Sequence, residues 1–91
     1  MVEIIFNYKQ IETIIQANLN DSFNSVIEKF INKTQLDINN IYFMSNGNII
    51  SNNEILIMNI MNNTEKIDKK KIILVISKNF SINNENSNMI K

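Results

Sequence analysis

The sequence predicts a single α+β domain in which one helix packs across a twisted sheet, and three observations support this. The chain has 91 residues, 44% of them hydrophobic, which is enough for one core but not for a second domain. Val2, Ile4 and Phe6 recur at the two-residue period of a strand that buries one face. After residues 20–22 the apolar residues recur at helical spacing instead. A helix that follows strands in this way favours a helix-on-sheet architecture.

A second strand is expected soon after the first. The polar residues 7–10 interrupt the pattern, and residues 11–19 then alternate again, with Thr13, Ile15 and Ala17 on one face. Two strands this close in sequence are typical of an antiparallel hairpin. We expect the inner face of this hairpin to receive the helix.

The helix is expected to begin after the capping-competent residues 20–22 and to end near Lys33 or Thr34. Its apolar residues recur three and four positions apart, so they form one stripe along the helix. Burial of that stripe on the hairpin is the largest single contribution that we expect to stability. The stripe residues are Phe23, Val26, Ile27 and Phe30.

The second half of the chain completes the sheet. We predict a strand over residues 41–44, a turn over residues 45–48 in which Gly47 supplies a positive φ, and a short return strand at residues 49–50. Residues 54–61 are apolar without a clean period, and we interpret them as a short helical or irregular cover for the core.

The last predicted strand, residues 72–76, is an unbroken run of Ile, Leu and Val. Such a run indicates a strand buried on both faces, or a central strand whose outer face is also apolar. We therefore place it in the middle of the sheet and assign residues 1–77 to the domain. Residues 78–91 are rich in Asn and Ser, and we expect a tail or linker there.

A basic cluster precedes this last strand, within a polar segment, residues 62–71, that we predict to be a loop. Glu65 and Asp68 lie among its lysines, and the chain contains no arginine for bidentate phosphate recognition. We interpret the segment as a solvated loop rather than an anion-binding site. The lysines are Lys66, Lys69, Lys70 and Lys71.

Two segments resemble ubiquitin without a gap. Residues 21–36 resemble the ubiquitin helix and its entry, and residues 41–50 resemble the third strand and the turn around Gly47. The resemblance extends from Met1 to about Ser77 and implies a ubiquitin-like β-grasp fold, with a mixed sheet of four to five strands and one main helix. The matched residues of the first segment are Asp21, Ser22, Phe23, Val26, Lys29, Phe30, Lys33 and Leu36.

The sequence departs from ubiquitin in two places. The segment before the last strand is about five residues longer, by the same alignment, and the expected loop there is correspondingly larger. The only glycine is Gly47, so the chain contains no Gly-Gly pair of the kind that conjugation requires in that family. We therefore expect a ubiquitin-like domain that is not conjugated to substrates.

The resemblance also implies a partner-binding patch at Tyr8, Met44 and either Ile73 or Val75. Strand alternation adds further residues, because side chains that alternate with buried ones point to the other face of the sheet. On this basis we expect an outer face that bears Ile5, Ile14, Met44, Ile73 and Val75. Two interpretations stay open: this face docks a protein partner, or it is covered by the chain's own tail through Phe80 and Ile82.

Composition excludes several classes of function. Nine acidic residues balance nine lysines, so no net field attracts nucleic acid or an anionic membrane. The chain has no histidine, no cysteine and no glycine-rich phosphate loop, so we expect neither an enzyme nor a metal or cofactor site. We expect a soluble cytoplasmic or nuclear protein, monomeric when isolated, that binds a protein.

The leading hypothesis is thus a non-catalytic interaction module. The alternative is a small accessory subunit whose outer face is permanently buried in a larger assembly. A β-grasp signalling domain that binds through basic residues of its second strand is disfavoured, because residues 11–18 contain no lysine or arginine.

Overall fold

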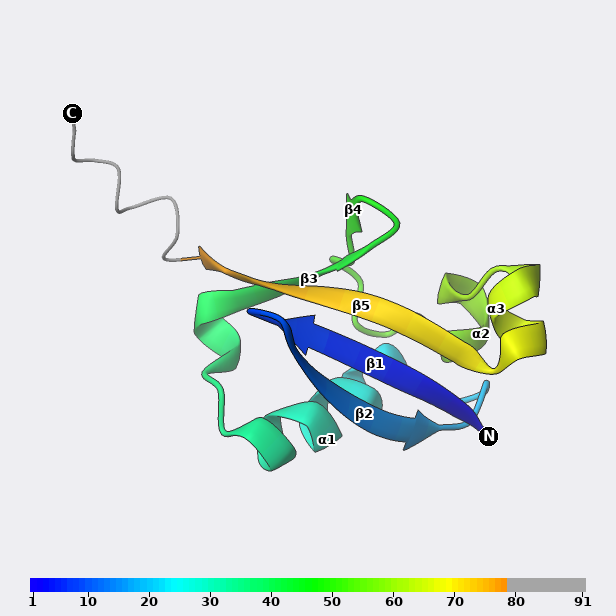
Figure 1. Ribbon diagram of the computed structural model, residues 1–91, viewed down its shortest axis with the longest axis horizontal. Helices are drawn as coiled ribbons and strands as arrows, with labels where there is room; N and C mark the ends of the chain where they lie inside the picture. Colours follow the sequence, from blue (N-terminus) through cyan, green and yellow to red (C-terminus); the bar gives the residue numbers. More distant parts are fainter. Residues whose placement is uncertain (79–91) are drawn as a thin grey trace.

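The structure is a computed structural model that describes residues 1–78, in which one helix lies across one face of a five-stranded mixed sheet (Figure 1). This is the predicted α+β architecture. The strands are β1 Val2–Tyr8, β2 Ile11–Ala17, β3 Ile41–Ser45, β4 Asn48–Ile49 and β5 Lys70–Ser77; the helices are α1 Phe23–Thr34, α2 Ile57–Ile60 and α3 Asn63–Asp68, with a 3₁₀ turn at Ile38–Asn40. The predicted tail covers residues 78–91, of which 79–91 lie outside the described residues.

The strands lie in the order β2-β1-β5-β3-β4, so β5 occupies the centre of the sheet as predicted. It runs parallel to β1 and antiparallel to β3, while the two hairpins, β1 with β2 and β3 with β4, are antiparallel. Only one face of β5 is buried, since Ile72 and Leu74 are 54% and 45% exposed, so its unbroken apolar sequence reflects a central strand whose outer face is also apolar.

The core lies between α1 and the inner face of the sheet, and four phenylalanines fill its centre. The ring of Phe6 stacks on that of Phe30 with centroids 4.3 Å apart, and Phe43 meets Phe6 edge-on at 5.7 Å. Offset-stacked and edge-on pairs are the arrangements that aromatic rings prefer. Phe23 lies edge-on to Phe43 at 5.6 Å, so all the rings form one cluster. The predicted helix stripe is therefore the helical half of the core.

Both ends of α1 are capped where the sequence predicts. The Ser22 hydroxyl accepts a hydrogen bond from the Ser25 amide at 3.2 Å, which is the usual N-cap contact. At the other end Gln35 adopts φ 64° and its amide donates to the carbonyl of Ile31 at 2.7 Å. These caps set the two ends of α1, which contains all four residues of the apolar stripe.

The two hairpin turns differ in their residues. Each has two residues with positive φ: Lys9 and Gln10 at 51° and 69° in the first, Asn46 and Gly47 at 53° and 84° in the second. Asn-Gly is the sequence that such turns favour, so Gly47 confirms the predicted turn. Lys9 and Gln10 adopt the same region without glycine, which strains the first turn.

The segment between β4 and β5 closes one end of the core. Ile57 in α2 is fully buried, and its amide donates to the carbonyl of Asp21 at 2.8 Å. This confirms the predicted short helical cover. Figure 1 shows α2 and α3 together at the end of the sheet where β5 begins.

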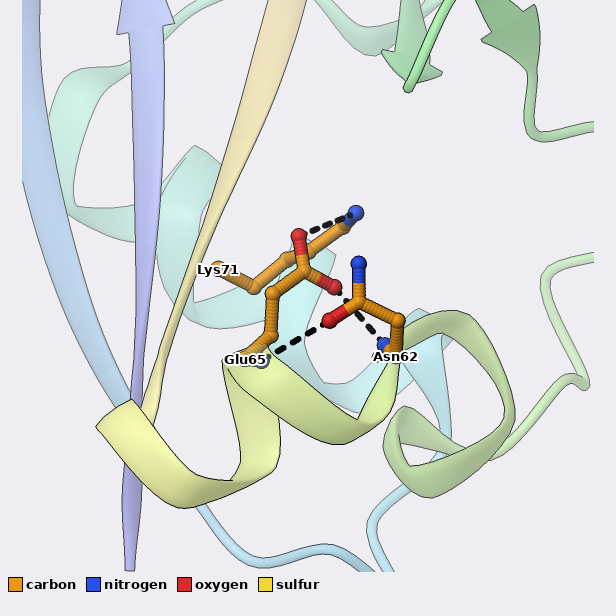
Figure 2. Close-up of polar contacts among 3 residues, drawn as sticks. All are labelled: Asn62, Glu65 and Lys71. Atoms are coloured by element: carbon orange, nitrogen blue, oxygen red, sulfur yellow. Dashed lines mark hydrogen bonds and ion pairs between the residues drawn. The ribbon is translucent and has the colours of Figure 1, made fainter.

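The prediction of a loop over residues 62–71 is wrong, because α3 lies within it, although most side chains of the segment are exposed as expected and Lys71 is the buried exception. Asn62 and Glu65 form a reciprocal capping box at the start of α3, with both hydrogen bonds 2.8 Å long. Lys71 lies in β5, is only 1% exposed, and its Nζ is 3.0 Å from Oε2 of Glu65 (Figure 2). The polar composition of this segment gave no indication of the short helix α3. The Glu65 carboxylate of that helix neutralises the charge of the buried Lys71.

Candidate protein-interaction surface

The face of the sheet opposite α1 is the candidate site. Along β1 the residues Val2, Ile4 and Phe6 are buried beneath the helix. Side chains alternate across a strand, so Ile5 points to the other face. Because α1 covers only one face of the sheet, the side chains of the opposite, outer face are not covered by that helix (Figure 1).

Pairing between strands joins apolar residues of the outer face into one path. Ile14 of β2 is paired with Ile5 of β1, and Ile5 is paired with Ile72 of β5. Paired residues point to the same face, and so do residues two positions apart in a strand. Leu74, two positions after Ile72, is paired with Met44 of β3, which is paired with Ile49 of β4. The outer apolar surface is defined as Ile5, Ile14, Met44, Ile49, Ile72 and Leu74.

These side chains are exposed to a degree that is unusual for a contiguous set. Ile14 and Leu74 are 43% and 45% exposed, and Ile72 and Ile49 are 54% and 57% exposed. Ile5 and Met44 are half-buried by their neighbours. Single exposed apolar residues are ordinary on protein surfaces, whereas a contiguous apolar surface is a candidate for an interaction site.

The rim of the outer apolar surface is polar and has little net charge. Glu3 and Gln16 are paired across β1 and β2, and the Gln16 amide donates to the Glu3 carboxylate at 3.4 Å. Lys70 is the β5 partner of Glu3, so charges of both signs lie at this end. Asn7 and Glu12 pair beyond Ile5 and Ile14. An apolar centre with a polar rim is the usual anatomy of a protein-binding surface.

The expected outward orientation of Ile73 and Val75 is wrong. Both are core residues, 0% and 4% exposed, and their neighbours Ile72 and Leu74 face outward instead. Residues 72–76 show no alternation, so the sequence does not specify which residues face the helix. The pairing of Ile5 with Ile72 decides it.

Tyr8 is likewise separate from the outer apolar surface. It shares the strand phase of Phe6 and packs against the core, with Lys9 Nζ 5.3 Å from the centre of its ring. It lines a groove of about 340 Å³ between the first hairpin and the end of α1. The other lining residues are Ile11, Thr13, Phe30, Thr34 and Leu36. The structure therefore brings together Ile5, Ile14 and Met44 of the predicted site, and adds Ile49, Ile72 and Leu74.

Residues 1–78 contain no group of three or more His, Cys, Asp or Glu side chains that could hold a metal ion. Within the same residues no helix has the length and apolar character needed to cross a bilayer. The tail residues Phe80 and Ile82, expected as an alternative cover for the outer face, lie outside the described residues.

The order of elements and the helix across a mixed sheet define a ubiquitin-like β-grasp fold, and comparison with solved structures supports this assignment. The solution structure of the ubiquitin-like domain of Arabidopsis thaliana protein At2g32350 matches with a TM-score of 0.69 at 9% identity, over 85% of this chain and 77% of that one. A second structure of At2g32350 gives 0.65 at 11% identity, over 96% and 94%.

A crystal structure of ATBAG1 in complex with HSP70 also matches, with a TM-score of 0.67 at 14% identity. The match covers 89% of this chain and 42% of that one. No protein-family model and no curated protein matches the sequence. Similarity at such low identity shows the fold alone.

Proposed function

We propose that this protein is a non-catalytic, ubiquitin-like interaction module that binds a protein partner through its outer apolar surface, without being conjugated to it. The observation that supports this most strongly is the unbroken apolar path from Ile14 in one edge strand to Ile49 in the other. Four of its side chains are more than two-fifths exposed. Burial of such a surface would favour association by the hydrophobic effect.

The shape of the path indicates what would fit it. The path crosses the strands rather than following one of them, and neighbouring strands lie about 4.8 Å apart. From β2 to β4 it therefore extends about 19 Å, which matches about three and a half turns of an α-helix. An amphipathic helix of a partner, or the flat apolar face of a domain, would cover it.

The similar structures support the ubiquitin-like fold of the proposed module and leave the partner open. One is a ubiquitin-like domain, and another contains ATBAG1 in complex with HSP70. The absence of histidine and cysteine from the sequence supports the non-catalytic assignment.

Capture from native extract with paired variants tests the proposal. Ile72→Asp with Leu74→Asp places two charges at the centre of the outer apolar surface, and Ile67→Asp is the matched control because Ile67 is 78% exposed on α3. The double variant should lose proteins that the wild type and the control both retain, with a melting temperature close to that of the wild type. Identical capture by all three forms would contradict the proposal.

The same variants distinguish a module from an accessory subunit. A subunit whose outer face is permanently buried would aggregate when produced alone, and the two aspartates would relieve that aggregation. A module should be monodisperse before and after the substitutions.

A further inference from the structure

Strand β2 is one edge of the sheet, and its open side presents unpaired backbone groups. In β1 the Glu3 amide donates to the carbonyl of Lys69 at 2.9 Å, on the β5 side, and every second residue of β1 shares that direction. Ile5 therefore turns its backbone toward β5, so its β2 partner Ile14 turns its own backbone away from β1. The residues with this orientation are Glu12, Ile14 and Gln16.

One side chain reaches this open side. Lys33, in the last turn of α1, donates from Nζ to the carbonyl of Ile14 at 3.4 Å. Within residues 1–78 no other protein group forms a hydrogen bond with the outward backbone of Glu12, Ile14 or Gln16. Lysines beside an edge strand are a common means of preventing strand addition. Strand β2 itself contains neither lysine nor proline.

The sequence of β2 is compatible with antiparallel pairing to a second copy of itself. With the two-fold axis at Ile14, each Ile14 lies opposite the other, and Glu12 lies opposite Gln16. No like charges face one another, and Glu12 can accept a hydrogen bond from the Gln16 amide. Ile14, 43% exposed, would bury its side chain against its counterpart. Nothing in the strand opposes this pairing.

We propose that Lys33 prevents the protein from dimerising through β2. In the symmetric pair the two Ile14 Cα atoms would be about 5.5 Å apart, so the two Lys33 ammonium groups that bond their carbonyls would also be close. Their repulsion, together with competition for the Ile14 carbonyl, disfavours the dimer. Loss of the Lys33 charge exposes an edge strand that a second copy extends into one continuous sheet. The proposal concerns the backbone of β2 and does not depend on the proposed function.

Sedimentation of the full chain tests this with Lys33→Met and the control Lys29→Met. Lys29 is exposed one turn earlier on α1, so its substitution adds the same apolar side chain away from the edge. Lys33→Met should raise the association constant for dimerisation at least tenfold over the wild type. Lys29→Met should have the same association constant as the wild type. In the same samples, hydrogen exchange should show new protection at the amides of Glu12, Ile14 and Gln16 in Lys33→Met only.

Reversal variants identify the surface that associates. Glu12→Pro removes an outward amide without removing a bond to β1, and Glu12→Lys with Gln16→Lys places lysines opposite each other if proline prevents folding. Either change, added to Lys33→Met, should restore the monomer. The proposal is overturned if Lys33→Met associates no more than the wild type, if the wild type is already a β2-linked dimer, or if the reversal variants stay associated.

Discussion

Nζ of Lys71 lies 3.0 Å from Oε2 of Glu65, and the lysine side chain is fully buried (Figure 2). The same glutamate caps the start of α3 through its hydrogen bond with the Asn62 amide. One carboxylate therefore both begins the helix and neutralises a charge in the core. Removing Glu65 would leave the charge of a fully buried lysine without a partner, which is costly. Removing Lys71 would leave a carboxylate that is 21% exposed and still bonded to the Asn62 amide.

Glu65→Gln should lower the free energy of unfolding by about 1–3 kcal/mol, because the lysine charge stays buried without its counter-charge. Glutamine can still accept the hydrogen bond from the Asn62 amide, so the loss reports mainly the ion pair. Urea unfolding, with the slope checked for two-state behaviour, measures it.

Lys71→Met should leave stability unchanged or raise it, and should rescue Glu65→Gln, since an apolar side chain of similar length needs no counter-charge. A loss of more than about 2 kcal/mol in Lys71→Met, comparable to a large core truncation, would show that the ammonium group makes a net favourable contribution.

Gln10→Gly should stabilise the first hairpin by about 0.5–1 kcal/mol, since Gln10 adopts φ 69°. Gly47→Ala should destabilise the second turn by a similar amount. Gly47 has φ 84°, and a Cβ there would meet no atom within 4 Å, so the cost is conformational rather than steric. Thermal unfolding of both variants measures these effects. A lower melting temperature for Gln10→Gly, or a higher one for Gly47→Ala, would contradict this account of the turns.

Ile73→Ala should cost about 2–5 kcal/mol, because it opens a cavity among buried side chains. Leu74→Ala, on the outer face, should cost less than about 1 kcal/mol. Denaturant unfolding of this pair tests the orientation of β5 directly. A larger loss for Leu74→Ala than for Ile73→Ala would mean that the strand has the opposite phase.

The sequence was informative wherever a clear period was present. Alternation located β1 and β2, and the spacing of Phe23 and Phe30 located α1 between its caps. The same alternation placed Ile5 and Ile14 on the outer face, in agreement with the structure. In these elements the local sequence pattern and the tertiary packing favour the same secondary structure and the same buried face.

The sequence was uninformative where burial depends on pairing between distant segments. Residues 72–76 are apolar throughout, so only the register with β1 and β3 decides that Ile72 and Leu74 face outward. The helix α3 was concealed by lysine-rich composition, although Asn62 and Glu65 have the three-residue spacing of a capping box. That spacing is the signal that would have located it.

Photo-crosslinking from position 74 tests the central claim most directly. A photoreactive residue in place of Leu74 lies at the middle of the outer apolar surface, and one in place of Ile67 lies on exposed α3 as a control. In native extract, position 74 should form an adduct with a distinct partner protein and position 67 should not. Adducts only within the chain itself, from position 74 to residues 79–91, would contradict the claim that this surface binds a partner.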